Sequence, residues 1–193
     1  MKKRVWILVA AVLLISACAV GGSLAWLADS AAITNTFTTG DIEIKLDEPN
    51  YKDPAKVYPG AEIAKDPTVT ILANSEACWV LVCVENNLVI DDAIVGIPNI
   101  HSDWTPVSVQ GNKTIYSYKA QVPTSANDTT LTKVFTTVTI SGEQVTKENI
   151  NTLEEKTITV TAYAHQAAGQ TAAEALLAFE AILGGTWAAP VNP

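Results

Sequence analysis

The most constraining feature of the sequence is a run of strict alternation at residues 157–165. Every second position from Ile158 to Ala164 carries an aliphatic side chain, and Thr, Tyr and His occupy the positions between. Side chains of a β-strand point alternately to two faces, so a period of two residues indicates a strand with one apolar face. An α-helix does not produce this pattern, because its same-face positions recur every three or four residues. The chain is therefore expected to be organised around a β-sheet.

Other segments carry the same signal. Residues 41–47 alternate in the same way, whereas residues 77–84 are apolar on both faces, which predicts a central strand of a sandwich, covered on both sides. The proline-bearing stretch 48–67 is predicted to be a loop, residues 86–112 an irregular excursion, and residues 143–155 a loop with one helical turn over 146–149. Further strands are predicted at residues 33–39, 68–73, near 104–109, 114–119 and 134–140.

The period changes after residue 169. Thr171 and Glu174 have the spacing of a capping box, in which the two side chains satisfy free backbone N–H groups at the start of a helix. Apolar residues then follow at helical spacing as far as Gly184, which predicts an amphipathic helix over residues 170–184, packed on the sheet. About seven to nine short strands with turns between them predict an antiparallel β-sandwich of jelly-roll type with this C-terminal helix.

The N-terminus has the three parts of a secretory signal peptide. Basic residues at positions 2–4 precede the apolar run 5–20, and Ser23 and Ala25 are small enough for the two subsites of a signal peptidase. Cleavage is therefore expected between Ala25 and Trp26, which gives a signal peptide at 1–25 and a single secreted domain at 26–193.

Three other interpretations of this segment stay open. The first is a weaker cleavage site at residues 30–32. The second is an uncleaved anchor, because residues 5–28 are uncharged and at about 1.5 Å per residue are long enough to cross a hydrocarbon core of roughly 30 Å. The third is a lipid-bearing N-terminus at Cys18, because residues 15–18 resemble a lipobox. Every one of them places the domain outside the cytoplasm.

The charge of the domain limits its partners. Removing residues 1–25 takes away three positive charges and no acids, which leaves nine Lys and Arg against 20 Asp and Glu. Binding to nucleic acid phosphates requires basic patches, so nucleic acid is not expected as a partner.

The two cysteines of the domain, Cys78 and Cys83, lie on one predicted strand. Five residues of extended chain separate them by roughly 16 Å and place them on opposite faces, whereas a disulfide requires Cα atoms about 4.4–6.8 Å apart. Both are therefore expected to be buried thiols.

Several motifs together resemble those of a known family. These are GGSLAWLAD at 21–29, TNTFT at 34–38 and GDIEI at 40–44, followed by VYPG at 57–60, KDP at 65–67 and the segments 74–85 and 158–169. They are similar to the motifs of the TasA/camelysin family of Gram-positive surface and biofilm-matrix proteins. One small difference is at residues 26–29, where this chain has Trp-Leu-Ala-Asp and the family more often has an aromatic pair before Thr-Asp. The resemblance implies a jelly-roll fold, processing by an ER-type (SipW-like) signal peptidase, and filaments built by strand donation.

The new N-terminal segment 26–39 supplies a mechanism for assembly. Its backbone groups need hydrogen-bond partners, and Trp26, Leu27, Ile33 and Phe37 need burial. A neighbouring copy with an open sheet edge would accept this segment as an added strand, and repetition makes a filament. The protein's partner is then itself, together with an anchor protein at the cell surface. The alternative is that the segment pairs within its own sheet, leaving a monomeric or anchored surface module that binds wall or host ligands.

Catalytic chemistry has little support in the sequence. No HExxH, GxSxG, phosphate-loop or CxxC motif is present. Some members of the family are described as metallopeptidases, so a secreted peptidase is a third hypothesis. His101 and Asp103, with Asp91 or Asp92, would supply metal ligands, but a zinc site normally draws three or four. We predict no catalytic residue, cofactor or metal site.

Three further features have an ordinary structural explanation. His165 is expected to be a solvent-exposed polar residue at a strand end. The acids Asp47, Glu48 and Asp53 are more typical of a solvated loop than of a calcium site. The aromatic residues Trp79, Trp104 and Trp187 are more typical of a core than of a sugar-binding platform.

Overall fold

The computed structural model describes residues 28–31, 41–51 and 57–190 of the 193. The signal peptide, Cys18, the cleavage site at Ser23, Ala25 and Trp26, and the expected contacts at Leu27, Ile33 and Phe37 lie outside these residues. Within the described part, no helix has the length and apolar character of a membrane span.

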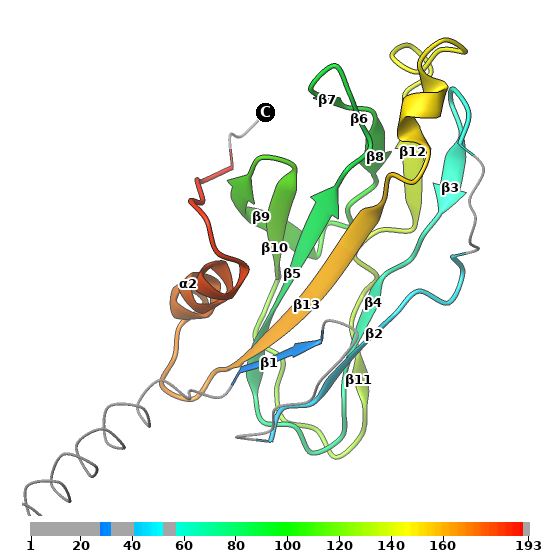
Figure 1. The fold of residues 1–193 in the computed structure, drawn as a ribbon. Helices are drawn as coiled ribbons and strands as arrows, with labels where there is room; N and C mark the ends of the chain where they lie inside the picture. Colours follow the sequence, from blue (N-terminus) through cyan, green and yellow to red (C-terminus); the bar gives the residue numbers. More distant parts are fainter. Residues whose placement is uncertain (1–27, 32–40, 52–56, 191–193) are drawn as a thin grey trace, which may run out of the picture.

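The larger sheet has five antiparallel strands and runs through the middle of the molecule (Figure 1). Its two longest strands, β13 and β5, pair over their whole lengths. In order across the sheet, the strands are β1 (Ala28–Ala31), β13 (Ile158–Gln166), β5 (Cys78–Asn86), β10 (Lys113–Tyr118) and β9 (Trp104–Gln110).

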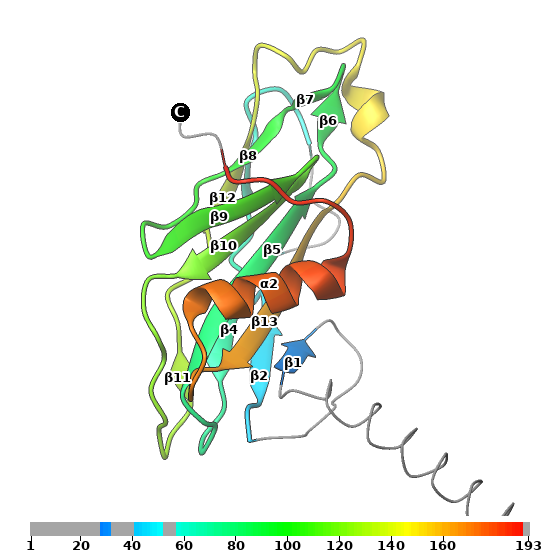
Figure 2. The ribbon, with the colours of Figure 1, turned by 90° about the vertical axis from the view of Figure 1, so that its left-hand side faces the viewer.

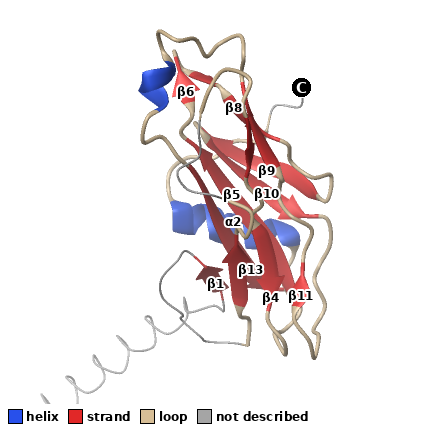
Figure 3. Cartoon of the chain, turned by 90° about the vertical axis from the view of Figure 1, so that its right-hand side faces the viewer, coloured by secondary structure: helices blue, strands red, loops and turns tan. Residues whose placement is uncertain are grey.

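Smaller sheets cover one face of the larger one (Figure 3). One consists of β11 (Thr129–Thr130), β4 (Thr68–Ile71) and β2 (Ile44–Asp47), and a second of β3 (Glu62–Ala64), β12 (Thr137–Ile140) and β8 (Gly96–Pro98). A hairpin of β6 (Val89–Ile90) and β7 (Ala93–Ile94) and a 3₁₀ helix, η1 (Ile150–Leu153), complete this part. The prediction of a mainly β, antiparallel fold with one C-terminal helix is confirmed.

The residues of β5 divide the core in two. Cys78, Val80, Val82 and Val84 belong to the large cluster shared with the smaller sheets, whereas Leu81 and Cys83 belong to a second cluster on the opposite face. The apolar character of both faces thus follows from burial on both sides, as the sequence predicts. Both cysteines are free thiols, and burial raises their pKa values to about 11.

The second cluster is covered by the helix α2 (Ala172–Leu183), which crosses the outer face of the larger sheet (Figure 2). The predicted capping box is present: the Glu174 N–H donates to Thr171 Oγ1, and the Thr171 N–H donates to the Glu174 carboxylate. Phe179 stacks on Tyr163 of β13, with ring centroids 4.8 Å apart and planes 1° from parallel. The contact holds the helix on the sheet.

Two loop predictions need correction. The stretch 48–67 contains β3, and the excursion 86–112 contains β6, β7 and β8. The helical turn lies at 150–153 instead of 146–149, because Asn149 and Thr146 use their side chains to bond nearby backbone N–H groups. Such local bonds compete with helix formation.

The outer edge of β9 is occupied by the C-terminal segment. Val109 and Ala188 exchange two backbone hydrogen bonds, of 2.8 and 2.9 Å, and Gln110 Nε2 donates to the Thr186 carbonyl. Pro106 also lies on β9 and has no backbone N–H to offer. This edge of the larger sheet is therefore protected against pairing with another chain.

Candidate functional site

The opposite edge of the larger sheet is formed by β1 and β13. β5 pairs with β13 from Ile158 to Gln166, whereas β1 pairs with β13 only from Ala162 to His165. Among the described residues, none pairs with the outer edge of residues 158–161. We call this four-residue stretch the open edge of β13.

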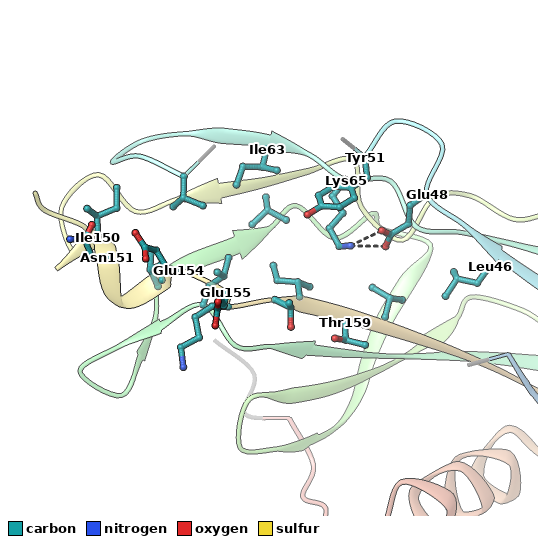
Figure 4. A pocket seen from close by; sticks show the side chains of 18 of the residues that line it. Leu46, Glu48, Tyr51, Ile63, Lys65, Ile150, Asn151, Glu154, Glu155 and Thr159 are labelled. Carbon is teal, nitrogen blue, oxygen red and sulfur yellow. Dashed lines mark hydrogen bonds and ion pairs between the residues drawn. The ribbon is translucent and has the colours of Figure 1, made fainter. Parts of the chain in front are cut away.

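A cavity of about 970 Å³ lies beside the open edge (Figure 4). Thr157 and residues 158–160 of β13 form one side of it, and η1, β3 and the end of β2 form the others. The lining combines apolar side chains with polar and charged ones. The apolar ones are Leu46, Val57, Ile63, Leu88, Val138, Ile150, Leu153, Ile158 and Val160.

One wall of the cavity is fixed by an ion pair between Lys65 and Glu48. Lys65 Nζ donates to both oxygens of Glu48, at 2.8 and 2.6 Å, and lies 4.6 Å from the centroid of the Tyr51 ring. The side chains of Lys65 and Glu48 are only 11% and 25% exposed. The pair therefore holds the chain after β2 against the end of β3.

The neighbouring Asp66 reinforces this wall. It is 2% exposed and accepts hydrogen bonds from the N–H of Asn50 at 2.9 Å, from Asn50 Nδ2 at 2.7 Å and from Lys133 Nζ at 2.9 Å. The pKa of Asp66 lies below its ordinary value. Burial alone would raise this pKa, but the hydrogen bonds from Lys133 and Asn50 stabilise the charged carboxylate by more than burial disfavours it. This network was not predicted. Its trace in the sequence is the adjacent charged pair Lys65-Asp66 before Pro67, which a loop normally exposes to solvent, so the pattern does not distinguish it from a surface pair.

His165 is buried, so the prediction of a solvent-exposed side chain is wrong. It is 6% exposed, and its Nδ1 lies 3.0 Å from the Tyr163 hydroxyl. Burial lowers its pKa, against smaller opposing effects of Gln170 and Glu174. The reason for the burial is α2, which folds back over this face of β13 and puts its first turn near the imidazole.

His101 and Asp103 are adjacent but engaged with other groups. The Asp103 N–H donates to His101 Nδ1 at 3.1 Å, and the Asp103 carboxylate accepts from Thr132 at 2.6 Å and from Lys119 at 3.0 Å. These bonds, led by the one from Thr132, lower the pKa of Asp103. Asp91 and Asp92 form the tight turn between β6 and β7. Within the described ranges, no three His, Cys, Asp or Glu side chains gather as a metal site requires.

The remaining candidates are separated by the fold. Asp47 pairs with Lys45 and Glu48 with Lys65, while Asp53 lies outside the described residues. Trp104 is 2% exposed and donates to the Thr132 carbonyl, whereas Trp79 and Trp187 pack against the cluster beneath α2. Because Trp104 and this pair belong to different clusters, the three indoles do not form one binding platform.

Comparison with known proteins gives one match. The camelysin metallo-endopeptidase family matches residues 1–80. The matched part includes β1 to β4 and the start of β5, and ends before β13 and α2. No curated protein and no solved structure matches the chain.

Proposed function

We propose that this chain is an exported structural subunit that polymerises by exchanging its N-terminal strand between copies. Its similarity over residues 1–80 to the camelysin metallo-endopeptidase family supports an assignment to the TasA/camelysin family of exported proteins. The observation that carries the proposal is the open edge of β13 with the apolar cavity beside it. An unpaired edge attracts another strand, and a cavity beside it gives that strand's side chains a place to bury.

The register of β1 indicates how a donated strand would lie. Ala28 stands opposite His165 and Ala31 opposite Ala162, in antiparallel order. A strand that continued four residues further in this register would pair with the whole open edge and place Ile33 opposite Val160, which lines the cavity. A donated strand in this register would therefore bring the expected contact residue Ile33 to the cavity.

The pairing of β1 with β13 can form within one molecule or between two copies. β1 has only four residues, so its release costs few hydrogen bonds. If β1 of one copy pairs with β13 of the next, each copy donates at one place and accepts at another. Such a head-to-tail contact produces a filament whenever the rotation between successive copies does not close a ring.

Two secreted chains, one beginning at Trp26 and one at Gly40, test the proposal by negative-stain microscopy and size-exclusion chromatography. The first is expected to give filaments and the second monomers, because the second lacks the strand to be donated. Monomers from both chains at high concentration would refute self-assembly through this segment.

Point variants separate strand donation from general loss of apolar surface. Ile33→Asp is expected to abolish filaments, because a carboxylate opposite Val160 would be buried in the cavity without a partner. Ile97→Asp is the matched control, since Ile97 is 59% exposed on β8, away from the open edge. A synthetic peptide of residues 26–39 is expected to bind the chain that begins at Gly40, and a scrambled peptide is not.

Two other functions make different predictions. A surface module that binds wall or host ligands would stay a competent monomer after removal of residues 26–39. The family description names a metallo-endopeptidase, and a peptidase would lose its activity with chelators and in His101→Ala. A casein-degradation assay with both treatments tests that hypothesis.

A further inference from the structure

The last described residues, 185–190, return from the end of α2 and lie beside β9 (Figure 2). We call this segment the C-terminal strap. Ala188 forms the two backbone hydrogen bonds with Val109 described above, and the Trp187 side chain packs against the cluster beneath α2. The strap therefore takes the place of a further strand at this edge of the larger sheet.

β9 itself carries little protection against pairing with another strand. Residues 104–110 include two valines and no Lys, Arg, Asp or Glu. Edge strands of natural proteins often carry such charges, which oppose pairing with another chain. Pro106 protects one position, because it has no N–H to donate. Protection of residues 107–110 depends on the strap.

The strap is held by few contacts. In an antiparallel ladder, the next pair of bonds after Ala188 would involve the residue two positions further on, which is Pro190 and has no N–H. The Gln110 side chain adds bonds to the carbonyls of Gly184 and Thr186, at 3.4 and 3.2 Å. No residue of the strap is buried. The strap can therefore leave β9 while the core of the domain stays intact.

We propose that the C-terminal strap is an autoinhibitory cover, and that its displacement lets β9 pair with β9 of a second copy. The strap shows that this edge accepts an antiparallel strand, and two β9 strands related by a two-fold axis are antiparallel. Their pairing replaces the bonds between Val109 and Ala188 and merges two larger sheets into one.

The contact differs from strand donation in what it builds. A two-fold contact uses the same surface on both copies, so it joins two copies and stops there. Where the chain forms filaments, many such contacts act together and hold two filaments side by side. The inference does not depend on the proposed function, because β9 lies at the edge of the sheet opposite β1 and β13.

A double variant of the secreted chain that begins at Trp26 releases the strap without changing β9. Ala188→Pro removes the N–H that donates to the Val109 carbonyl. Gly185→Ala places a Cβ 1.8 Å from Gln110 Nε2, which forces that side chain and its bonds away. A chain that ends at Gly184 lacks the strap altogether and is the second variant, expected to behave in the same way.

The matched control makes the same two kinds of change elsewhere. Ala189→Pro lies next to the bridge, but the Ala189 N–H takes no part in it. Gly169→Ala replaces another glycine of positive φ, +69° against +83° for Gly185, with open space around it. This control is expected to behave like the unmodified chain.

Size-exclusion chromatography with light scattering, and negative-stain microscopy, measure the outcome. If the unmodified chain is monomeric, the molar mass of both strap variants is expected to double; if it polymerises, their filaments are expected to lie in pairs. Adding Val109→Pro is expected to undo either effect, because it removes an N–H that points away from the sheet, where an edge strand tolerates proline.

Two results would overturn the strap's assignment. One is association of the strap variants no greater than that of the control. The other is association that persists with Val109→Pro, which would trace it to exposed apolar surface instead of the β9 edge. An unmodified chain that stays monomeric while the strap variants dimerise would count against the proposed function alone.

Discussion

Buried polar residues carry the largest consequences at the scale of single side chains. His165 shares a hydrogen bond with Tyr163 beneath α2, and Lys65 shares two with Glu48 beside the cavity. Each of these groups has left water for a small number of protein partners. Removing a partner, or changing the charge of the group, therefore costs more than it would at the surface.

Stability is expected to fall in mild acid because of His165. Its pKa in the folded chain lies below the ordinary value of 6.5, so the unfolded chain takes up the proton more readily. The contribution is complete above pH 6.5 and is lost as the pH falls through the lower, folded value. Thermal unfolding monitored between pH 7.5 and 5 would show this slope, and His165→Gln is expected to flatten it. An unchanged slope would exclude His165 as its source.

Glu48→Gln is expected to destabilise the fold, because it leaves Lys65 partly buried without an anion. Loss of one partner of a buried pair costs about 3–5 kcal/mol, and Glu48, a quarter exposed, belongs at the lower end of that range. Urea unfolding measures the change. Asp47→Asn is the control, since its partner Lys45 is 62% exposed and an exposed ion pair contributes little to stability.

At the scale of elements, the sequence predicts those helices and strands that have a local pattern of their own. Alternation at 157–165 and the doubly apolar run 77–84 correspond to β13 and β5, and the Thr171–Glu174 box begins α2. β3 has three residues and is a strand because β12 pairs with it, far along the chain, so no local pattern indicates it. The burial of His165 and the cavity have the same origin. Each forms where segments distant in sequence meet.

The two cysteines report on the two sides of the larger sheet. Phe179→Ala is expected to cost about 3–5 kcal/mol through loss of its contact with Tyr163. It is also expected to make Cys83, beneath α2, react with thiol reagents faster than Cys78, which lies between the sheets. Leu177→Ala is exposed and is expected to change stability by no more than about 0.5 kcal/mol. Equal acceleration at both thiols would indicate global unfolding instead of opening of α2.

At the scale of the whole molecule, charge opposes assembly. With nine Lys and Arg against 20 Asp and Glu after residue 25, the copies repel each other, and added salt shortens the range of this repulsion, to about 8 Å at physiological ionic strength. Filament growth is therefore expected to accelerate as sodium chloride is raised from 10 to about 150 mM. Light scattering and microscopy measure the rate. Slower growth in salt would show that attraction between opposite charges drives assembly.

The closed edge of β9 has a consequence for any polymer of this chain. In the part of the larger sheet that the structure describes, Pro106 and the Val109–Ala188 bridge protect one edge, and the open edge of β13 is the place for an incoming strand. A polymer built this way is directional, with a free acceptor edge at one end and a free donor strand at the other. A molecule that binds either end would therefore limit the length of the polymer without binding to its interior subunits.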